Sequence, residues 1–226
     1  TSDVTLVSDA DVTSFAVGNS IAKTVTVTYT APAASGTGQN MPFTDVSTGD
    51  WYYGSVYGAW KNKLISGASE TLYKPNNTLT VAETVKLSAA LHQLQNNGQV
   101  TLTNGTPWYS TYVAYAVEHG IIEKEYLDYT PAQMHAPASR TEFVHIFFGA
   151  MNDYEVLNDI ADDQIPDVKM GDKYASEIYT FYRAGILTGS GSSGVFNPSS
   201  TIKRSEAAAI LNRMFDASTR KSFTLS

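Results

Sequence analysis

Three short stretches of the sequence carry residues whose types and spacing could bind an anion. They read Thr80-Val81-Ala82-Glu83, Ser139-Arg140-Thr141-Glu142 and Lys203-Arg204-Ser205-Glu206. In the first two, a Ser or Thr stands three residues before a Glu and ahead of a helical apolar run, which is the signature of a capping box. In the last two, an Arg occupies the first helical position, beside free backbone N–H groups and the positive end of the helix dipole. Such a helix start is suited to hold a carboxylate or a phosphate.

These residues also have simpler interpretations. The two arginines could be solvated first-turn charges or ordinary salt-bridge partners, but a cation there opposes the helix dipole by ~0.3–1 kcal/mol, so we favour a ligand role for Arg140 and Arg204. The glutamates are explained most simply by the helix start itself. Helix capping is therefore predicted for Thr80, Glu83, Ser139, Glu142 and Glu206.

The three stretches end three copies of one longer pattern. Each copy opens near an aligned pair, which is Trp51-Tyr52, Trp108-Tyr109 or Lys173-Tyr174, and an aliphatic pair follows thirteen residues later without a gap. The aliphatic pairs are Leu64-Ile65, Ile121-Ile122 and Ile186-Leu187. Constant spacing through a helix and its end predicts one helix–loop–helix unit present three times. The second copy is degenerate, because Ala132 and Met134 replace the aromatic residue and the proline of the loop.

The fold class follows from the apolar pattern of these units. The second helix of each copy has apolar residues at helical spacing, as in Phe143, Ile146 and Phe147, so each unit buries only one face. We predict an all-α fold, a pseudo-threefold trimer of helix–loop–helix repeats sharing a central helical bundle. An open solenoid is the alternative, but it would need capping units and none is evident.

The first 41 residues differ in texture from the rest. Residues 21–30 alternate apolar residues and Thr with period two, and residues 4–7 read as a second strand, so a short β hairpin followed by a linker is predicted. The predicted divisions are residues 1–41 for hairpin and linker, 42–104 for the first repeat, 105–160 for the degenerate second repeat, and 161–226 for the third repeat and C-terminal tail.

Composition narrows the class of protein. The 226 residues can bury a core, and the absence of Cys excludes disulfides and thiolate metal sites. With 15 Lys and Arg against 22 Asp and Glu, the formal charge of −7 argues against nucleic acid, so an anion must be bound through local cations. The 14 Tyr suit carbohydrate, although half-buried helix packing also accounts for them. We expect a mature or trimmed chain without a leader and without a membrane span.

Catalytic and metal sites are not expected. Glu142 and His145 have the Glu-x-x-His spacing of di-iron bundles, but such sites need a second copy of that motif. Asp159, Asp162 and Asp163 lack the spacing of a calcium loop. Residues 189–194 lack the Lys and the strand-to-helix setting of a nucleotide-binding loop. Since no nucleophile elbow is present either, we expect neither an enzyme nor a cofactor.

Several motifs together resemble the S-layer homology family. They are Phe43-Thr44-Asp45-Val46, the weaker Ile165-Pro166-Asp167-Val168, the glycine-rich loop that ends in Phe196-Asn197-Pro198, and the helix openings with Arg and Glu. The resemblance spans residues 42–216. It implies a secreted, non-covalent anchor module of the bacterial cell surface, cell wall or S-layer. Family members bind secondary cell-wall polysaccharide, especially a terminal N-acetylmannosamine with a pyruvate ketal, in grooves between repeats.

The resemblance also implies site residues. The arginine of the family's Thr-Arg-Ala-Glu motif pairs with the ketal carboxylate, a role that falls on Arg140 and Arg204, whereas Val81 cannot supply a charge. The other candidate groove residues are aromatic residues that could instead anchor the core, aspartates that could instead fix a turn, and a loop glycine. They are Trp51, Tyr52, Trp108, Tyr109, Tyr174, Asp45, Asp167 and Gly189.

A monomeric anchor that binds wall polysaccharide, without membrane insertion, is the favoured interpretation. One alternative is a structural or protein-interaction module with degenerate grooves. The other is an enzyme acting on wall glycan, which would need paired carboxylates across a cleft, and the sequence nominates no such pair.

Overall fold

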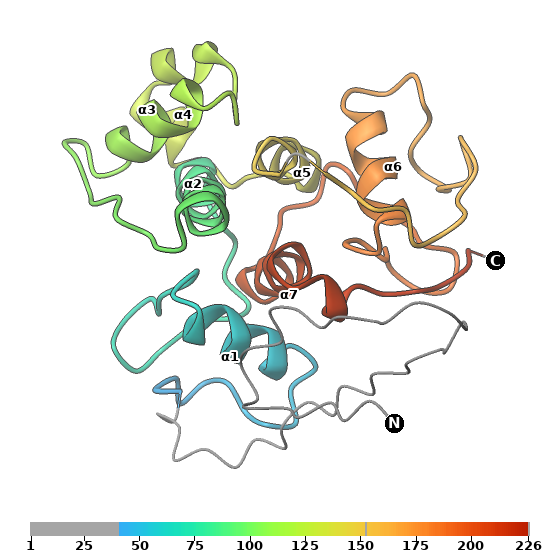
Figure 1. Ribbon diagram of the computed structural model, residues 1–226, viewed down its shortest axis with the longest axis horizontal. Helices are drawn as coiled ribbons and strands as arrows, with labels where there is room; N and C mark the ends of the chain where they lie inside the picture. Colours follow the sequence, from blue (N-terminus) through green and yellow to red (C-terminus); the bar gives the residue numbers. More distant parts are fainter. Residues whose placement is uncertain (1–40, 152, 226) are drawn as a thin grey trace, which may run out of the picture. The chain divides into compact units, whose positions relative to one another are not determined.

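The computed structural model describes residues 41–151 and 153–225, and these residues form an all-α structure without a sheet (Figure 1). The predicted fold class is therefore confirmed. Apart from residue 41, the predicted β hairpin and linker of residues 1–41 lie outside the described residues. Within the described residues, no helix is both long enough and apolar enough to cross a membrane. The helices are α1 (Tyr53–Lys61), α2 (Val81–Asn97), α3 (Ser110–Glu118), η1 (Lys124–Asp128), α4 (Pro131–Met134), α5 (Arg140–Phe148), α6 (Ala175–Arg183), α7 (Arg204–Phe215) and η2 (Ala217–Thr219).

The helices of this unit form a central group and an outer group (Figure 1). α2, α5 and α7 are central, with α3 packed on α2, α6 on α5, and α1 on α7. Along the chain the helices form three pairs, which are α1 with α2, α3 with α5, and α6 with α7. Because α1 of the first pair packs on α7 of the third, the three pairs close into a ring. The predicted divisions after residues 104 and 160 fall between α2 and α3 and between α5 and α6.

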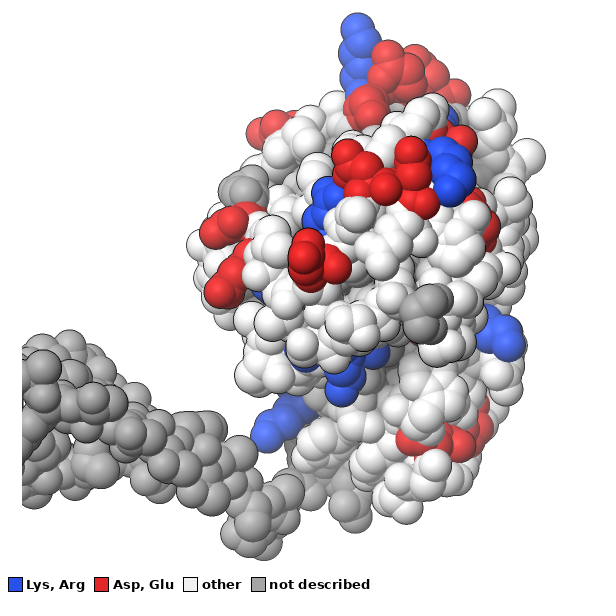
Figure 2. Space-filling view, turned by 90° about the vertical axis from the view of Figure 1, so that its right-hand side faces the viewer, with Lys and Arg blue, Asp and Glu red and all other residues white. Residues whose placement is uncertain are grey.

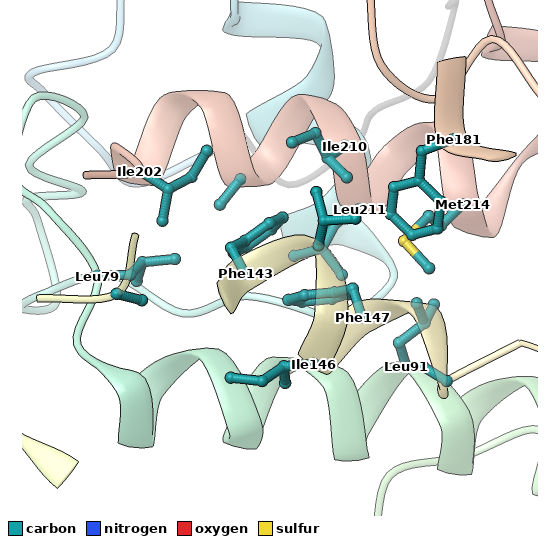
Figure 3. Close-up of a cluster of buried hydrophobic side chains, with 14 of the residues drawn as sticks. Leu79, Leu91, Phe143, Ile146, Phe147, Phe181, Ile202, Ile210, Leu211 and Met214 are labelled. Carbon is teal, nitrogen blue, oxygen red and sulfur yellow. The ribbon is translucent and has the colours of Figure 1, made fainter. Parts of the chain in front are cut away.

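The core lies between the three central helices (Figure 3). Phe143 and Phe147 are four residues apart on α5, so they share one face of the helix, and their rings stack with centroids 4.4 Å apart. Leu91 from α2 and Leu211 from α7 are, like both phenylalanines, fully buried in the same cluster. Each central helix therefore buries apolar side chains that a single helix pair could not cover.

A ring of backbone hydrogen bonds joins the segments that lead into the central helices. Leu79, Ala138 and Ile202 each stand two residues before the first residue of a central helix, and all three are buried. Leu79 donates its N–H to Ile202 (3.1 Å), Ile202 donates to Ala138 (3.3 Å), and Ala138 donates to Leu79 (2.9 Å). The starts of α2, α5 and α7 are thereby held side by side in equivalent positions.

Candidate functional site

A groove, here called groove A, lies where the start of α7 meets α2 and the loop that follows α1. Its volume is about 390 Å³. Arg204 of α7, Glu83 and Lys86 of α2, and Trp108 before α3 line it together with Tyr73 of the loop. Lys86 was not among the predicted site residues. Its signal in the sequence was its position three residues after Glu83, on the same helix face.

Arg204 stands at the first position of α7, as predicted, and is held by the neighbouring loop. Its Nε donates to the carbonyl oxygen of Tyr73 at 2.8 Å and its Nη2 to that of Ser66 at 2.9 Å. The guanidinium lies over the Tyr73 ring, 4.7 Å from the centroid, and its Nη1 is 3.8 Å from Glu83. These contacts fix the orientation of the guanidinium in groove A.

Arg140, at the first position of α5, has an equivalent environment. Its Nε donates to the carbonyl oxygen of Phe196 at 2.7 Å, and its guanidinium lies over the ring of the same residue, 5.3 Å from the centroid. Its Nη1 pairs with Glu206 at 3.1 Å. The Arg140 side chain is 11% exposed and that of Arg204 is 14% exposed, so the neighbouring repeat encloses both arginines, and Arg140 differs chiefly in its closer glutamate.

The backbone N–H groups at these helix starts are not free, contrary to the prediction from sequence. The first two residues of α5 and of α7 donate to carbonyl oxygens of the lead-in segment of the neighbouring pair, at distances between 2.8 and 3.2 Å. The donor–acceptor pairs are Arg140 to Ser200, Thr141 to Pro198, Arg204 to Asn77 and Ser205 to Pro75. These four N–H groups are therefore not available to an anion, which must be bound mainly by side chains.

The predicted capping residues lie at the starts of the central helices. The Thr80 hydroxyl accepts from the Glu83 N–H (3.2 Å) while the Glu83 carboxylate accepts from the Thr80 N–H (2.8 Å). Ser139 accepts from the Glu142 N–H at 3.1 Å. At α7, Lys203 has no side-chain acceptor, and only the Glu206 carboxylate contributes, by accepting the Lys203 N–H at 2.9 Å.

Asp45 and Asp167 organise loops and do not line groove A. Asp45 accepts the N–H groups of Tyr73 and Lys74, both at 2.8 Å, and Asp167 accepts those of Phe196 and Asn197, at 2.8 and 2.6 Å. Each aspartate thus holds the loop whose aromatic residue supports an arginine. The turns that open the first helices are instead fixed by Asp50 and Asp172, which sequence reasoning missed. Each accepts the N–H of the residue three positions earlier.

The candidate aromatic residues separate into different environments. Trp51 is 68% exposed, which excludes the core alternative for it, whereas Tyr109 is buried. Trp108 is half-buried in groove A, where the Lys86 ammonium lies 5.7 Å from the centre of its ring. Tyr52 is half-buried and meets Trp51 edge to face. Tyr174 is half-buried elsewhere and stacks on His145, 3.7 Å between ring centroids.

Gly189 has a structural reason to be glycine. Its φ is +69°, and a Cβ placed on it would lie 2.4 Å from the backbone of Gly194 and 2.6 Å from the Tyr182 hydroxyl. Its backbone conformation and this close approach both require the absence of a side chain.

A second groove, here called groove B, lies at the start of α5. Its volume is about 520 Å³. Its walls carry three carboxylates, one ammonium, two hydroxyls and three phenol rings, from Glu123, Glu125, Glu142, Lys173, Ser139, Thr141, Tyr126, Tyr129 and Tyr174. Groove B therefore has more acidic than basic side chains, unlike groove A. Figure 2 shows one face of the molecule, on which acidic side chains are more numerous in the upper half and also gather at the lower right, while basic ones lie singly or in pairs.

His145 connects the walls of groove B to α6. Its Nε2 is 2.9 Å from Glu123 and its Nδ1 is 3.1 Å from Glu177. Burial alone would lower the pKa of His145, but the hydrogen bonds with Glu177 and Glu123 outweigh burial and raise it. Among the described residues, no group of three His, Asp or Glu side chains is placed to hold a metal ion.

A comparison with known protein families matches the two segments that contain the loops held by Asp45 and Asp167. Residues 42–84 and 164–208 match the S-layer homology domain. Each matched segment begins just before an opening motif and ends in the first turns of a central helix, α2 or α7. An S-layer homology match indicates association with a cell surface or cell wall, and the domain is an anchoring rather than a catalytic module.

Two curated relatives also match this chain. Exoglucanase XynX of Acetivibrio thermocellus is 25% identical over 189 residues, which cover 80% of this chain and 17% of the relative. Amylopullulanase of Thermoanaerobacterium thermosulfurigenes is 27% identical over 164 residues, which cover 69% of this chain and 8% of the relative. The chain spans less than a fifth of the length of either protein, so the activities in their names are stated of those proteins alone.

Proposed function

We propose that this chain is a non-covalent cell-wall anchor that binds an anionic secondary cell-wall polysaccharide in groove A. The observation that carries the proposal is the convergence of Arg204, Lys86 and Trp108 on one cavity. Two cations beside an aromatic ring suit a sugar that bears a carboxylate. The S-layer homology match and the two enzyme relatives support an anchoring role for a secreted surface protein.

The ligand group is the carboxylate of a pyruvate ketal on a terminal N-acetylmannosamine. Arg204 has five N–H donors, and two backbone carbonyls occupy its Nε and one N–H of Nη2. The remaining donors are held in a fixed direction by those bonds, so little side-chain entropy is lost when a carboxylate binds. Lys86 adds a second positive charge, and Trp108 offers an apolar face to the C–H groups of the sugar.

The same contacts give the second candidate function its support. Arg140 donates to a backbone carbonyl and pairs with Glu206 at 3.1 Å, so a close carboxylate already neutralises its charge. This observation favours a structural or protein-interaction role for that part of the molecule. Under this alternative, no wall glycan binds to the wild-type chain.

Titration calorimetry with a pyruvylated wall disaccharide and its depyruvylated counterpart tests the proposal. We expect the pyruvylated sugar to bind more tightly, because a hydrogen bond to a charged group contributes ~1.5–3 kcal/mol. Arg204→Met should weaken binding by at least about tenfold, and Lys86→Gln should weaken it by a smaller factor. Lys124→Gln, in η1 and outside groove A, is the matched charge control and should bind like the wild type.

Thermal unfolding of each variant separates lost binding from lost folding, because Arg204 also holds the loop of Tyr73 and Ser66. Equal affinity for the two sugars would show that the ketal is not recognised. Full affinity in a folded Arg204→Met, Lys86→Gln double variant would show that groove A is not the binding site. No binding of either sugar by the wild type would leave the structural module as the better interpretation.

A further inference from the structure

Groove B differs from groove A through one residue of the helix-start ring. In two of the three helix starts, the arginine at the first position reaches the glutamate at the third position of the neighbouring central helix. Arg204 reaches Glu83 and Arg140 reaches Glu206. The remaining pair of equivalent positions is Val81 on α2 and Glu142 on α5.

Val81 is placed as the two arginines are. It donates its N–H to the lead-in segment of α5, at Ala136 (3.0 Å), as Arg140 and Arg204 donate to the lead-in segments beside them. The Val81 side chain is buried and apolar, so it brings no cation to Glu142. Glu142 therefore lines groove B without the guanidinium that both of its counterparts have.

The other cations near Glu142 do not replace that guanidinium. His145 lies between Glu123 and Glu177 and is committed to them through both ring nitrogens. Lys173 is an exposed residue at the rim of the groove, with its ammonium over the Tyr174 ring, 4.5 Å from the centroid. Burial raises the pKa of Glu142, and the hydrogen bond from the Ser139 backbone and the charges of Lys173 and His145 oppose this effect without cancelling it.

The rest of groove B has the surface chemistry that suits a sugar. Tyr126 and Tyr129 stack with centroids 4.6 Å apart, and Tyr174 is fixed by its stacking on His145. Ser139 and Thr141 add hydroxyl groups to the same cavity. Tyr126 is buried, whereas Tyr129 and Tyr174 are half-buried. Half-buried phenol rings beside hydroxyls present both an apolar face and hydrogen-bonding groups to a hexose ring. A cavity with these walls is more than a set of surface carboxylates.

We propose that groove B binds a sugar unit with a free, non-acetylated amino group, whose ammonium pairs with the Glu142 carboxylate. The ammonium would occupy the electrostatic role that Arg204 and Arg140 have beside Glu83 and Glu206. Taking a wall glycan as the source of this sugar rests on the proposed function. The charge preference of groove B is thus opposite to that of groove A, so one anchor would bind two chemically different units of a polymer.

The experiment is a titration of the full chain with an oligomer of glucosamine and with the fully N-acetylated oligomer of the same length. We expect the free amine to bind at least about tenfold more tightly, as a charge-assisted hydrogen bond should. Glu142→Gln should abolish this preference. Val81→Arg should weaken binding of the glucosamine oligomer, because a guanidinium beside Glu142 would compete with the ammonium. Glu118→Gln, at the exposed end of α3, removes a carboxylate outside the groove and should change nothing.

The outcomes separate this inference from the proposed function. Binding of the pyruvylated sugar is measured on the same variants, and Glu142→Gln should leave it intact because groove A is unaltered. Equal binding of the two oligomers, or a preference that survives in folded Glu142→Gln, would overturn the assignment whatever groove A does. If a lysine-containing tripeptide competes as well as the glucosamine oligomer does, groove B is a peptide site and the sugar assignment is wrong.

Discussion

Arg140 and Arg204 show how one residue type supports both the fold and the candidate site. Each donates to the carbonyl of a loop aromatic residue and lies over the ring of that same residue. They differ in their glutamate contact, which is 3.1 Å for Arg140 and 3.8 Å for Arg204. Because the longer contact is the weaker one, Arg204 has more to gain from a ligand carboxylate. Groove A is for this reason the better candidate for an anionic sugar.

The ion pairs of His145 make the stability of the fold depend on pH. The pKa of His145 is raised above its ordinary value of 6.5, so its stabilising ion pairs are complete below about pH 6.5 and are lost as pH rises through the higher folded-state pKa. Burial alone would raise the pKa of Glu123, but the hydrogen bond with His145, a backbone hydrogen bond and the charges of His145 and Lys173 together lower it. The contribution of Glu123 is therefore lost only at acidic pH. We expect Tm to fall by about 2–8 °C between about pH 6 and pH 9, equivalent to roughly 1–2 kcal/mol.

Thermal unfolding monitored by circular dichroism at a series of pH values measures this effect. The His145→Gln variant keeps a hydrogen-bonding side chain but cannot carry a charge, so its Tm should be lower near pH 6 and nearly independent of pH. His119→Gln is the control, because His119 lies at the exposed end of α3. An equally steep decline in His145→Gln would assign the pH dependence to other groups.

At the scale of elements, the three central helices begin with unequal caps. α2 has a reciprocal capping box between Thr80 and Glu83, α5 has a serine cap, and α7 begins after Lys203, whose side chain cannot accept a hydrogen bond. The ring of lead-in segments compensates, since the first two N–H groups of α7 reach carbonyl oxygens beside α2. Tertiary contacts thus replace part of a local cap at this helix.

We expect Lys203→Ser to stabilise the molecule and Thr80→Ala to destabilise it, each by about 0.5–2 kcal/mol. The serine would supply an acceptor for the Glu206 N–H, whereas the alanine would remove the acceptor of the Glu83 N–H. Urea unfolding curves measure both changes. Lys203→Ala serves as the control for loss of the exposed lysine alone. A Lys203→Ser variant no more stable than Lys203→Ala would show that the neighbouring lead-in segment already satisfies this helix start.

At the scale of the whole described unit, the ring of helix pairs makes each pair depend on the other two. α1 covers α7, although the two helices are far apart in the sequence, and the central core draws side chains from α2, α5 and α7. Removing one pair would expose apolar faces on both of its neighbours. Stability is therefore shared over the ring.

We predict that residues 42–216 unfold in one cooperative transition and that a fragment ending near residue 104 does not fold. The fragment would leave Val85 and Leu91 of α2 exposed, and both are fully buried in the intact ring. Calorimetry and circular dichroism measure the thermal unfolding of the intact unit and test whether the fragment folds. Cooperative melting of the fragment as a monomer would disprove the shared core.

The charge of the whole chain leads to a prediction about salt. A formal charge of −7 repels an acidic polymer, so attraction must come from the local cations Arg204 and Lys86. Raising the salt concentration from low to physiological strength should weaken binding of the pyruvylated sugar, because exposed charges are screened. Affinity that is independent of salt would indicate stacking and neutral hydrogen bonds instead.

The sequence by itself determined the features that depend on neighbouring residues. Helix starts at Val81, Arg140 and Arg204 were predictable, because capping residues and apolar periodicity act within a few positions along the chain. The all-α class followed from the same signals. The roles of Asp45 and Lys86 were not predictable, because they depend on which loop and which helix lie beside them.

Only the tertiary structure decided which groups remain for a ligand. Arg204 contacts Tyr73, 131 positions earlier in the chain, and this contact exists only because the first and third helix pairs meet in the ring. The ring as a whole gives the helix-start N–H groups of α2, α5 and α7 to backbone carbonyls of neighbouring lead-in segments, and at α2 the residue equivalent to the two arginines is Val81. Spacing along the chain can place an arginine at a helix start, but its partners are set by packing between distant segments, which no local pattern encodes.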